Sequence, residues 1–330
     1  MKENNIFKDM ENDVNASNLD EHTKQKFFSN ILHLKNKKIN LMITGATGCG
    51  KSSTINAMFN TDVAKVGMGV DPETMDIRKY ELDNLILWDS PGLGDGKEKD
   101  IQHSKGIISK LNELDENGLP LIDLVLVILD GGSRDLGTSY ELINSVIIPN
   151  LGENPKDRIL IAINQADVAM KGRYWDFQNN KPEPKLVSFL EEKVESVKNR
   201  VKEATGVDIK PIYYSAGFKD EGEEQRPYNL SKLLYFIVKN TPLDKRLVYV
   251  NTTSDDKNMW SDNDEIKNYT AEIQKSFVET IVETSNVGGK IGKELGDILG
   301  MGKTGEAIGK VTGAVVGAFK SVVSSIFSWF

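Results

Sequence analysis

The sequence predicts a doubly wound α/β domain with a mostly parallel sheet, together with an N-terminal helix and a C-terminal helical hairpin. Three observations lead to this fold class. Strand-like and helix-like segments alternate between residues 37 and 240. The segment 122–129 is nearly all apolar, as expected for a strand that is buried on both faces of a parallel sheet. A glycine-rich turn joins a first strand, 39–44, to a helix that begins near residue 53.

The elements follow one another in a regular order. Residues 1–20 are polar and are expected to be irregular, whereas apolar residues at helical spacing predict an amphipathic helix over 21–34. The expected strands cover 39–44, 77–82, 85–88, 122–129, 158–163 and 209–214. The expected helices of the domain cover 53–59, 101–114, 138–148, 185–204 and 229–239.

The pattern changes after residue 240. Residues 251–263 are polar and predict a linker, and apolar residues from Ile266 to Ile281 mark one face of a further helix. The chain is therefore divided into a polar N-terminus with one helix (1–36), the α/β domain (37–240), a linker with a helix (241–285) and a tail (286–330).

Composition narrows the class of protein and its compartment. The net charge is −8 and 27% of the residues are charged, so nucleic acid is not expected as a partner. The single cysteine, Cys49, excludes a disulfide framework and fits a reducing cytoplasm. The three scattered histidines build no metal site, so a magnesium ion held with a nucleotide is the one metal expected. Because no apolar run follows the first residues, we expect a cytoplasmic protein without a signal peptide.

The strongest local motif is the glycine-rich turn. Residues 45–52 read Gly-Ala-Thr-Gly-Cys-Gly-Lys-Ser and fit the spacing G-x-x-x-x-G-K-[ST] between a strand and a helix. In that context backbone N–H groups converge on phosphate oxygens, and the helix N-terminus adds positive potential. Lys51 would reach the β- and γ-phosphates, and the Ser52 hydroxyl would ligate magnesium. The residues expected to hold the phosphates are Gly45, Thr47, Gly48, Cys49, Gly50, Lys51, Ser52 and Ser53.

A second motif follows the strand 85–88. It reads Asp89-Ser90-Pro91-Gly92 and fits D-x-x-G. A carboxylate at Asp89 can hold magnesium through a water molecule, and the N–H of Gly92 can meet the γ-phosphate.

Two further motifs predict recognition of a guanine base. Asn164-Gln165-Ala166-Asp167 ends the strand 158–163. The Asp167 carboxylate can accept hydrogen bonds from N1–H and from the exocyclic amine of guanine, a pair of donors that adenine lacks, and Asn164 can brace the loop. The sequence Ser215-Ala216-Gly217 follows the strand 209–214 and offers a backbone N–H to guanine O6.

In this order, the four motifs resemble the guanine-nucleotide motifs of the Ras-like (TRAFAC) P-loop GTPase superfamily, in particular its Era-like bacterial branch. The resemblance covers about residues 37–240 and leaves both termini outside. It implies that the chain binds GTP, GDP and Mg²⁺ and hydrolyses GTP, with Lys51, Thr74 and Gly92 as catalytic residues.

The resemblance also implies a set of magnesium ligands. Ser52 and Asp89 come from the motifs, and a threonine from the loop 60–76 is expected to close over the metal and the γ-phosphate. Thr74 is favoured for this role over Thr61, which lies too close to the first helix.

Two residues depart from the family pattern. Gln165 stands where a lysine is usual, so weaker guanine affinity is expected, with specificity retained through Asp167. Leu93 stands where Ras-like proteins carry the glutamine that positions the attacking water, so hydrolysis should be slow until a partner or self-association accelerates it. Arg134 is either a group that approaches the phosphates in a dimer or a solvated loop residue. The aromatic segment 170–177 is either a lid beside the base, a docking surface, or a packed loop.

In the C-terminal tail, glycine recurs at every fourth residue. The two series are Gly288, Gly292, Gly296, Gly300 and Gly305, Gly309, Gly313, Gly317. On helices each series makes a stripe where a second backbone can approach closely. Residues 311–330 carry one charge, Lys320, and reach the length of about 20 residues that spans a bilayer. Three interpretations stay open: a glycine-zipper hairpin in or on a membrane through 287–330, a soluble hairpin that packs on the domain or on a second copy, and a flexible tail.

The sequence thus predicts a GTP-binding, GTP-hydrolysing switch whose tail associates with a membrane or with another subunit. One alternative is a membrane-remodelling or membrane-permeabilising effector that the nucleotide only gates. Another is a ribosome- or RNA-associated regulatory GTPase, although the sequence shows no basic aromatic surface for nucleic acid. A third is an ATPase with a similar motif set.

Overall fold

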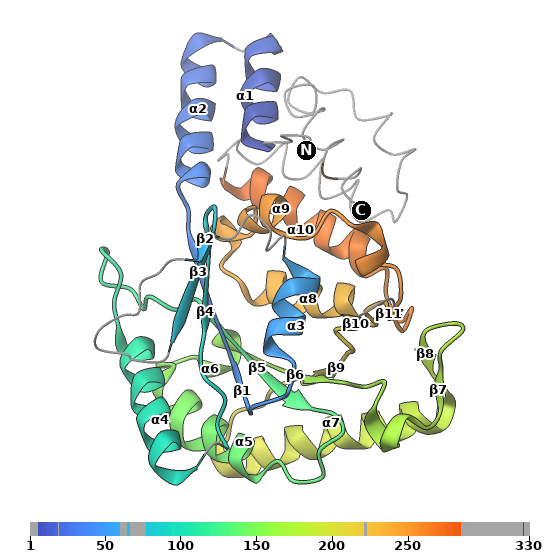
Figure 1. The fold of residues 1–330 in the computed structure, drawn as a ribbon. Helices are drawn as coiled ribbons and strands as arrows, with labels where there is room; N and C mark the ends of the chain where they lie inside the picture. The colour runs from blue at the N-terminus through green and yellow to red at the C-terminus, as the bar shows by residue number, and fades with distance from the viewer. Residues whose placement is uncertain are drawn as a thin grey trace.

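The computed structural model describes residues 6–18, 20–59, 65–66, 77–94, 96–220, 223–284 and 326. Within these residues the centre of the molecule is a seven-stranded sheet in the order β2-β3-β4-β1-β5-β6-β9 (Figure 1). The strands are β1 (Ile39–Gly45), β2 (Lys65–Val66), β3 (Arg78–Leu82), β4 (Leu85–Asp89), β5 (Leu124–Asp130), β6 (Ile159–Asn164) and β9 (Ile212–Tyr213). The predicted doubly wound α/β fold with a mostly parallel sheet is confirmed, whereas the expected C-terminal helical hairpin lies outside the described residues.

The sheet is parallel except at one edge. β1 pairs in parallel with both β4 and β5, and the parallel pairing continues through β6 to β9. β3 runs antiparallel to β4, and Asp83 turns that hairpin with a φ of 52°, as expected for a two-residue turn. Consequently β1, β4, β5, β6 and β9 all end at the same edge, where their following loops meet.

Helices cover both faces of the sheet because neighbouring residues of each central strand point to opposite faces. On one face, Leu41 and Ile43 share a core with α3 (Lys51–Met58) and α8 (Leu230–Asn240). The other face packs against helices α4 (Lys97–Asn112) and α7 (Pro184–Thr205), and against a helical stretch that runs through α5 (Gly137–Glu141), the π-helix η2 (Leu142–Ile147) and the 3₁₀ turn η3 (Ile148–Asn150). Short elements complete this part of the chain: α6 (Pro155–Arg158), η4 (Ala169–Gly172) and the hairpins β7 (Trp175–Asp176) with β8 (Lys181–Pro182) and β10 (Phe218–Asp220) with β11 (Glu223–Gln225).

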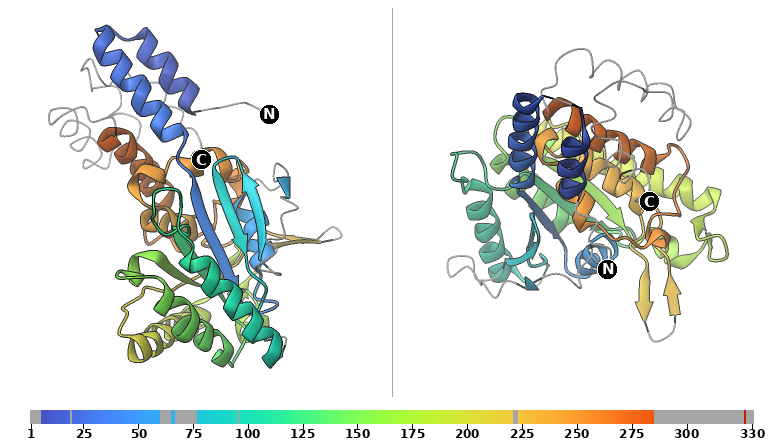
Figure 2. Two further views of the ribbon diagram at one scale, coloured as in Figure 1. Left: turned by 90° about the vertical axis from the view of Figure 1, so that its left-hand side faces the viewer. Right: turned by 90° about the horizontal axis from the view of Figure 1, so that it is seen from above.

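The N-terminus is more ordered than its composition suggests. The expectation that residues 1–20 are irregular is wrong for 6–16, which form helix α1 (Ile6–Ala16) against α2 (Glu21–Lys35). Phe7, Met10 and Val14 recur at a helical spacing and are buried, although acidic and amide residues surround them in the sequence. The two helices stand together at one end of the molecule (Figures 1 and 2).

The expected linker also packs on the domain. Four elements follow α8 along the chain in this region. They are the 3₁₀ turn η5 (Leu243–Lys245), α9 (Val248–Thr252), the 3₁₀ turn η6 (Lys257–Met259) and α10 (Tyr269–Thr284). The N–H of Ser254 donates to the carbonyl of Met58 at 2.9 Å, and the carbonyl of Asp262 accepts from the N–H of Asn229 at 2.8 Å. Trp260 lies between Ser254 and Asp262 in the sequence, and its side chain is buried. The segment 251–263 is therefore packed on the domain although its sequence is polar. The division into domains after residue 240 stays a prediction.

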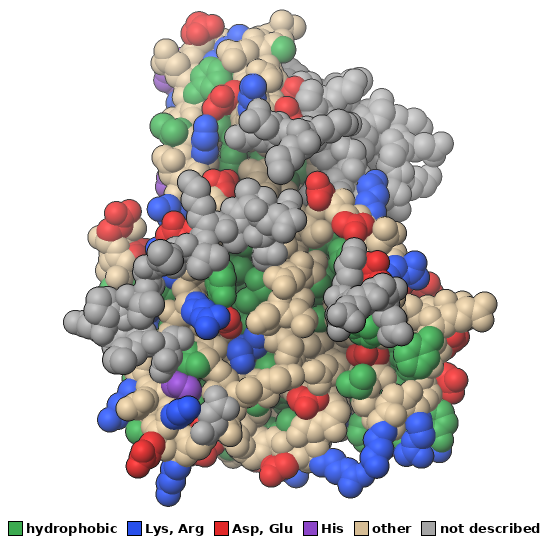
Figure 3. All heavy atoms as spheres, in the orientation of Figure 1, with side chains coloured by type: hydrophobic (Ala, Val, Ile, Leu, Met, Phe, Trp, Pro, Cys, Tyr) green, Lys and Arg blue, Asp and Glu red, His purple; other side chains and the backbone are tan. Residues whose placement is uncertain are grey.

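Near the C-terminus the structure describes one residue of the predicted tail. Ile326 is fully buried, and its carbonyl accepts a hydrogen bond from the Gln274 side chain of α10 at 3.4 Å. The two glycine series and Lys320 lie outside the described residues. Among the helices that the structure does describe, none is long and apolar enough to cross a bilayer. Figure 3 shows basic and acidic side chains interspersed over one face of the molecule.

A buried ion pair ties the segment after α8 to the sheet. Lys245 Nζ lies 2.6 Å from Asp123 Oδ1, and Asp123 Oδ2 accepts the N–H of Asn40 at 2.9 Å. The Asp123 side chain is 7% exposed, so the loss of its cation would leave a desolvated charge.

We predict that Lys245→Met lowers the free energy of unfolding by about 2–4 kcal/mol, because it strands the Asp123 carboxylate in the interior. The matched control is Lys37→Met, which breaks a more exposed pair with Asp244 and should cost less than about 1 kcal/mol. Urea unfolding of both variants measures the difference, and equal losses would contradict the prediction.

Candidate nucleotide-binding site

The loops that carry the four motifs meet at the carboxyl edge of the sheet. The phosphate-loop motif follows β1 and leads into α3, and the D-x-x-G motif follows β4. The motif that begins at Asn164 follows β6, and the motif that begins at Ser215 follows β9. A site at this edge follows from the parallel topology, since the ends of neighbouring strands lie side by side there.

Glycines give the phosphate loop its shape. A Cβ on Gly45 would lie 2.2 Å from the carbonyl oxygen of Ile128, and a Cβ on Gly50 would lie 2.2 Å from the Asn164 side-chain nitrogen. Gly50 also has a φ of 88° at the start of α3, in the left-handed region that favours glycine. Lys51 Nζ donates to the carbonyls of Gly45 and Ala46 at 3.2 Å each, so its ammonium group lies over the loop.

Four of the residues expected to hold phosphates are open to solvent. Thr47, Gly48, Ser52 and Ser53 are exposed, and Ser52 lies in the first turn of α3. Cys49 is buried instead, and burial raises the pKa of its thiol to about 11. The thiol therefore stays protonated at neutral pH, and it packs in the apolar core.

The second motif lies directly against the phosphate loop. The N–H of Ser90 donates to the carbonyl of Ile43 at 3.0 Å, and the N–H of Thr47 donates to the carbonyl of Leu93 at 3.2 Å. A Cβ on Gly92 would lie 2.4 Å from the Thr47 nitrogen, so this close approach requires glycine. The Leu93 side chain is buried in the apolar core of the α4 face.

Asp89 has the properties expected of a residue that holds a metal ion through water. Burial raises the pKa of its carboxyl above the ordinary value, while the cations of Lys51 and Arg78 lower it. Its Oδ1 atom is buried and has no hydrogen-bond partner among the described residues. An orphaned buried carboxylate oxygen beside the phosphate loop fits hydrated Mg²⁺, a cation that prefers oxygen ligands and keeps several waters.

The third and fourth motifs are tied to each other and to the phosphate loop. Asn164 Nδ2 donates to the carbonyl of Cys49 at 3.0 Å, and Asn164 Oδ1 accepts the N–H of Ala216 at 2.9 Å. The Ser215 hydroxyl donates to Asp167 Oδ1 at 2.6 Å. The Asp167 carboxylate is thus oriented by a neighbour just after β9, whereas its contact with a guanine base stays a prediction.

Gln165 stands where the family pattern has a lysine, and its side chain contacts the phosphate loop. Its Nε2 donates to the carbonyl of Gly48 at 3.0 Å, so it makes the link to the phosphate loop that the amine of a lysine would make.

The structure leaves three expectations open. Thr74 and Thr61 lie outside the described residues. The Ala216 N–H already donates to Asn164, so its contact with guanine O6 stays a prediction. Arg134 lies in the loop after β5 and lines a different pocket.

Sequence reasoning missed one support of the site. Below the phosphate loop, the hydroxyls of Thr54 and Tyr214 lie 2.6 Å apart, and Thr54 Oγ1 donates to the carbonyl of Gly50 at 2.8 Å. A threonine one turn into the helix and a tyrosine at the end of β9 carry no distinctive sequence signal.

This geometry defines a nucleotide-binding site of the P-loop class, and comparison with known proteins narrows the class. Residues 40–165 match the model of a protein family described as 50S ribosome-binding GTPase. Residues 40–165 are therefore similar to the P-loop GTPase domain of that family.

Two curated relatives from Escherichia coli K12 are similar to part of the chain. The uncharacterized protein YkfA is 29% identical over 156 residues, which cover 46% of this chain and 50% of YkfA. The uncharacterized protein YfjP is 30% identical over 131 residues, which cover 38% of this chain and 41% of YfjP. The chain thus spans about half the length of the curated relatives it matches.

Three solved structures illustrate the likeness of the fold. LeoA, a bacterial dynamin GTPase from ETEC, is 14% identical over 90% of this chain and 46% of its own, with a TM-score of 0.40. The G domain of the T. maritima FeoB iron transporter is 18% identical over 62% of this chain and 98% of its own, with a TM-score of 0.34. The probable GTP-binding protein engB is 20% identical over 61% of this chain and 97% of its own, with a TM-score of 0.33. The assignment rests on the family match and the site geometry, not on these neighbours.

We predict opposite effects of Asp89→Asn on stability and on metal dependence. Because burial raises the pKa of Asp89 in the folded protein, its ionised form costs stability at neutral pH, and this cost disappears as the pH falls through the folded pKa. The neutral amide should therefore raise the unfolding midpoint of the nucleotide-free protein at neutral pH. It should also reduce the gain in GDP affinity on adding Mg²⁺ by about tenfold.

Unfolding and GDP titrations with and without Mg²⁺ check both effects. The control is Asp255→Asn, which neutralises an exposed carboxylate and should change neither quantity. A destabilised Asp89→Asn protein with normal magnesium dependence would contradict the assignment.

Proposed function

We propose that the chain is a Mg²⁺-dependent switch that binds and hydrolyses GTP. The observation that carries this proposal is the bond of 2.6 Å between Ser215 and Asp167, which orients a buried carboxylate at the base-reading position. Asn164 joins that position to the phosphate loop. A ligand that carries both guanine and phosphates satisfies the two halves of the site at once.

In the proposed mechanism the residues of the chain bind and orient the nucleotide. The N–H groups of the phosphate loop and the ammonium group of Lys51 hold the phosphates. Ser52, Asp89 and Thr74 are the proposed ligands of Mg²⁺, directly or through water. When bound, the metal neutralises charge that develops on the phosphate oxygens. The N–H of Gly92 is proposed to donate to the γ-phosphate.

We infer slow hydrolysis by the isolated chain. The side chain of Leu93 is 4% exposed and packs in the core, so it supplies no hydrogen bond to a water molecule. A partner or a second copy of the chain would have to position the attacking water. We also assign the chain to the Era-like branch as part of this proposal.

Asp167→Asn tests the choice of base. Loss of a charged acceptor for two guanine donors should weaken GDP binding by at least about tenfold, since a hydrogen bond to a charged group contributes about 1.5–3 kcal/mol. ADP affinity should not change, because adenine offers no such pair of donors. The exposed Asp157→Asn serves as the control. If the base preference survives in Asp167→Asn, the ATPase alternative replaces this proposal.

We further propose that the C-terminal glycine-rich helices connect the switch to a membrane or to another subunit. The regular spacing of the glycines supports close helix packing. The docking of Ile326 on α10 supports communication between the tail and the domain. A cytoplasmic protein that reaches the membrane through its C-terminus fits these features. The alternative that also uses a membrane is an effector that permeabilises it.

The description of the matching family supports a second candidate, a regulatory GTPase that binds the ribosome. Co-sedimentation with ribosomes that persists at moderate salt would favour it, since salt removes nonspecific charge contacts.

Flotation with liposomes tests the membrane proposal. The full chain should float more with a non-hydrolysable GTP analogue than with GDP, or the reverse, because the nucleotide changes access to the tail. A chain ending at residue 286 should not float with either nucleotide, and GDP binding shows that this control is folded. Equal behaviour of all four samples would remove the membrane switch and leave the tail as a subunit contact.

A further inference from the structure

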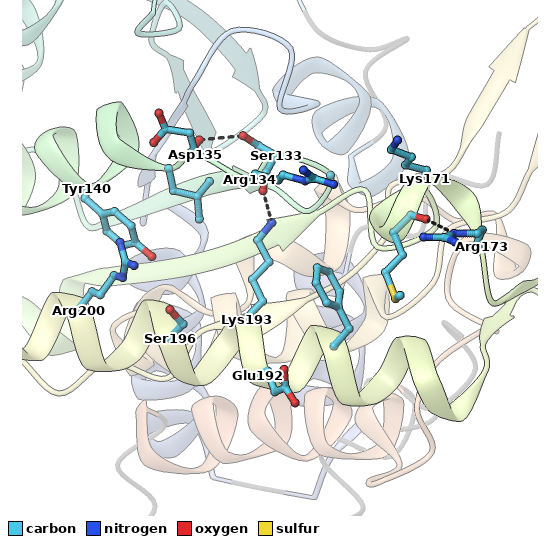
Figure 4. A pocket seen from close by; sticks show the side chains of 14 residues that line it. Ser133, Arg134, Asp135, Tyr140, Lys171, Arg173, Glu192, Lys193, Ser196 and Arg200 are labelled. Atoms are coloured by element: carbon cyan, nitrogen blue, oxygen red, sulfur yellow. Dashed lines mark hydrogen bonds between the residues drawn. The ribbon is translucent and has the colours of Figure 1, made fainter.

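A pocket lies between the loop 131–137, the η4 turn and α7, apart from the four nucleotide motifs (Figure 4). Its volume is about 580 Å³, within the range of about 300–1,000 Å³ that is usual for small-molecule sites. It shares no lining residue with the four nucleotide motifs. The proposed GTPase function gives this pocket no role.

The pocket is strongly basic in a chain whose net charge is −8. Its lining contains two acidic residues, Asp135 and Glu192, and the five basic residues Arg134, Lys171, Arg173, Lys193 and Arg200. None of the five cations forms an ion pair with another residue in the part of the chain that the structure describes. Asp135 is engaged in its own loop, where its Oδ1 accepts the N–H of Gly137 at 2.8 Å. The local excess of positive charge predicts an anionic ligand.

Lys193 fixes one positive charge at the centre of the pocket. Figure 4 shows it rising from α7 toward the loop after β5. Its Nζ donates to the carbonyls of Asp130, Gly131 and Ser133 at 3.1, 2.7 and 2.7 Å. The three carbonyl groups fix the ammonium group in place, and the nearby Asp130 carboxylate offsets part of its charge. The other four basic side chains therefore supply most of the positive charge of the pocket.

Arginines supply the groups that recognise a phosphate. The Arg200 guanidinium lies over the Tyr140 ring at 5.3 Å, and Arg173 Nε donates to the carbonyl of Met170 at 3.3 Å. These contacts orient the two planar groups before a ligand arrives, and guanidinium forks match phosphate oxygens in pairs.

The rim near Arg173 is held in an unfavourable conformation. Met170, Lys171 and Tyr174 have φ angles of 53°, 61° and 68°, in a region that residues other than glycine rarely adopt. Such strain persists where the surrounding structure demands it, and it concentrates at ligand sites.

The remaining lining is apolar. Leu136, Tyr140, Met170 and Phe189 contribute to the wall, and Phe189 is 37% exposed although it is a large aromatic residue. A bare phosphate would leave this wall in water. We propose that the pocket binds a small phosphorylated ligand that carries an aromatic or other apolar group.

Binding in this pocket would be coupled to the guanine motif. The N–H of Gly131 donates to the carbonyl of Asn164 at 2.8 Å, and a Cβ on Gly131 would lie 2.5 Å from that oxygen. The loop held by Lys193 therefore rests on the strand end that bears Asn164. By linkage, a ligand that shifts this loop changes guanine-nucleotide affinity, and the nucleotide changes the affinity of the pocket by the same factor.

Calorimetry on the full chain tests the proposal with three probes: phenyl phosphate, inorganic phosphate and phenol. The protein is loaded with GDP and Mg²⁺ so that the phosphate loop is occupied. Phenyl phosphate should bind more tightly than inorganic phosphate, and phenol should not bind. The double variant Arg134→Gln/Arg173→Gln should weaken phenyl phosphate binding by about tenfold or more, because it removes two charge-assisted donors.

The matched control is Lys202→Gln/Lys210→Gln, which makes the same charge change outside the pocket and should bind the probe normally. Both double variants should retain GDP binding, which shows that they are folded. Equal loss in the two variants, or no saturable binding at millimolar concentrations, would overturn the proposal. If the chain fails to bind GDP, the proposed function fails instead, and the comparison of the two double variants without nucleotide still tests the pocket.

Discussion

The structure of the site depends on the two hydrogen bonds of the Asn164 side chain. One bond holds the carbonyl of Cys49 in the phosphate loop, and the other holds the N–H of Ala216 at the end of β9. Asn164 is 1% exposed, so an amide that lost either partner would be left unsatisfied in a dry interior. Gly50 can lie against this side chain only because it has no Cβ. One residue at the end of β6 therefore sets the spacing between the phosphate loop and the segment that follows β9.

Sequence reasoning succeeded where burial or backbone geometry leaves few choices. The strand over 124–130 was recognisable because both faces are covered, and the observed register places it between β1 and β6. The phosphate loop was recognisable because Gly45 and Gly50 meet neighbouring backbone and side-chain atoms at distances that allow no Cβ. The predicted association of the four motifs followed from the same topology, since all four begin at one edge of the sheet. The roles of the individual residues stay predictions.

Sequence reasoning failed where the information lies in contacts distant along the chain. Helix α1 has a short apolar stripe within a mostly polar sequence. The stripe is buried because the helix packs on α2. The polar residues near Trp260 suggested a linker because their partners, Met58 and Asn229, are far away in sequence. The hydrogen bond from Gln165 to Gly48 was likewise not predicted, because the sequence shows only that a glutamine stands where the family pattern has a lysine.

That bond has a consequence for how the site responds to its surroundings. Gln165 reproduces the position of a lysine amine without its charge, so it adds no ion-dependent attraction for the phosphates. Lys51 is then the one cation among the residues of the phosphate loop and of the 164–167 segment. Retention of the nucleotide should accordingly change less with ionic strength than in a site that uses two lysines, and should depend more on the fit of uncharged hydrogen-bonding groups. The chain would keep its nucleotide under salt conditions that weaken sites held mainly by charge.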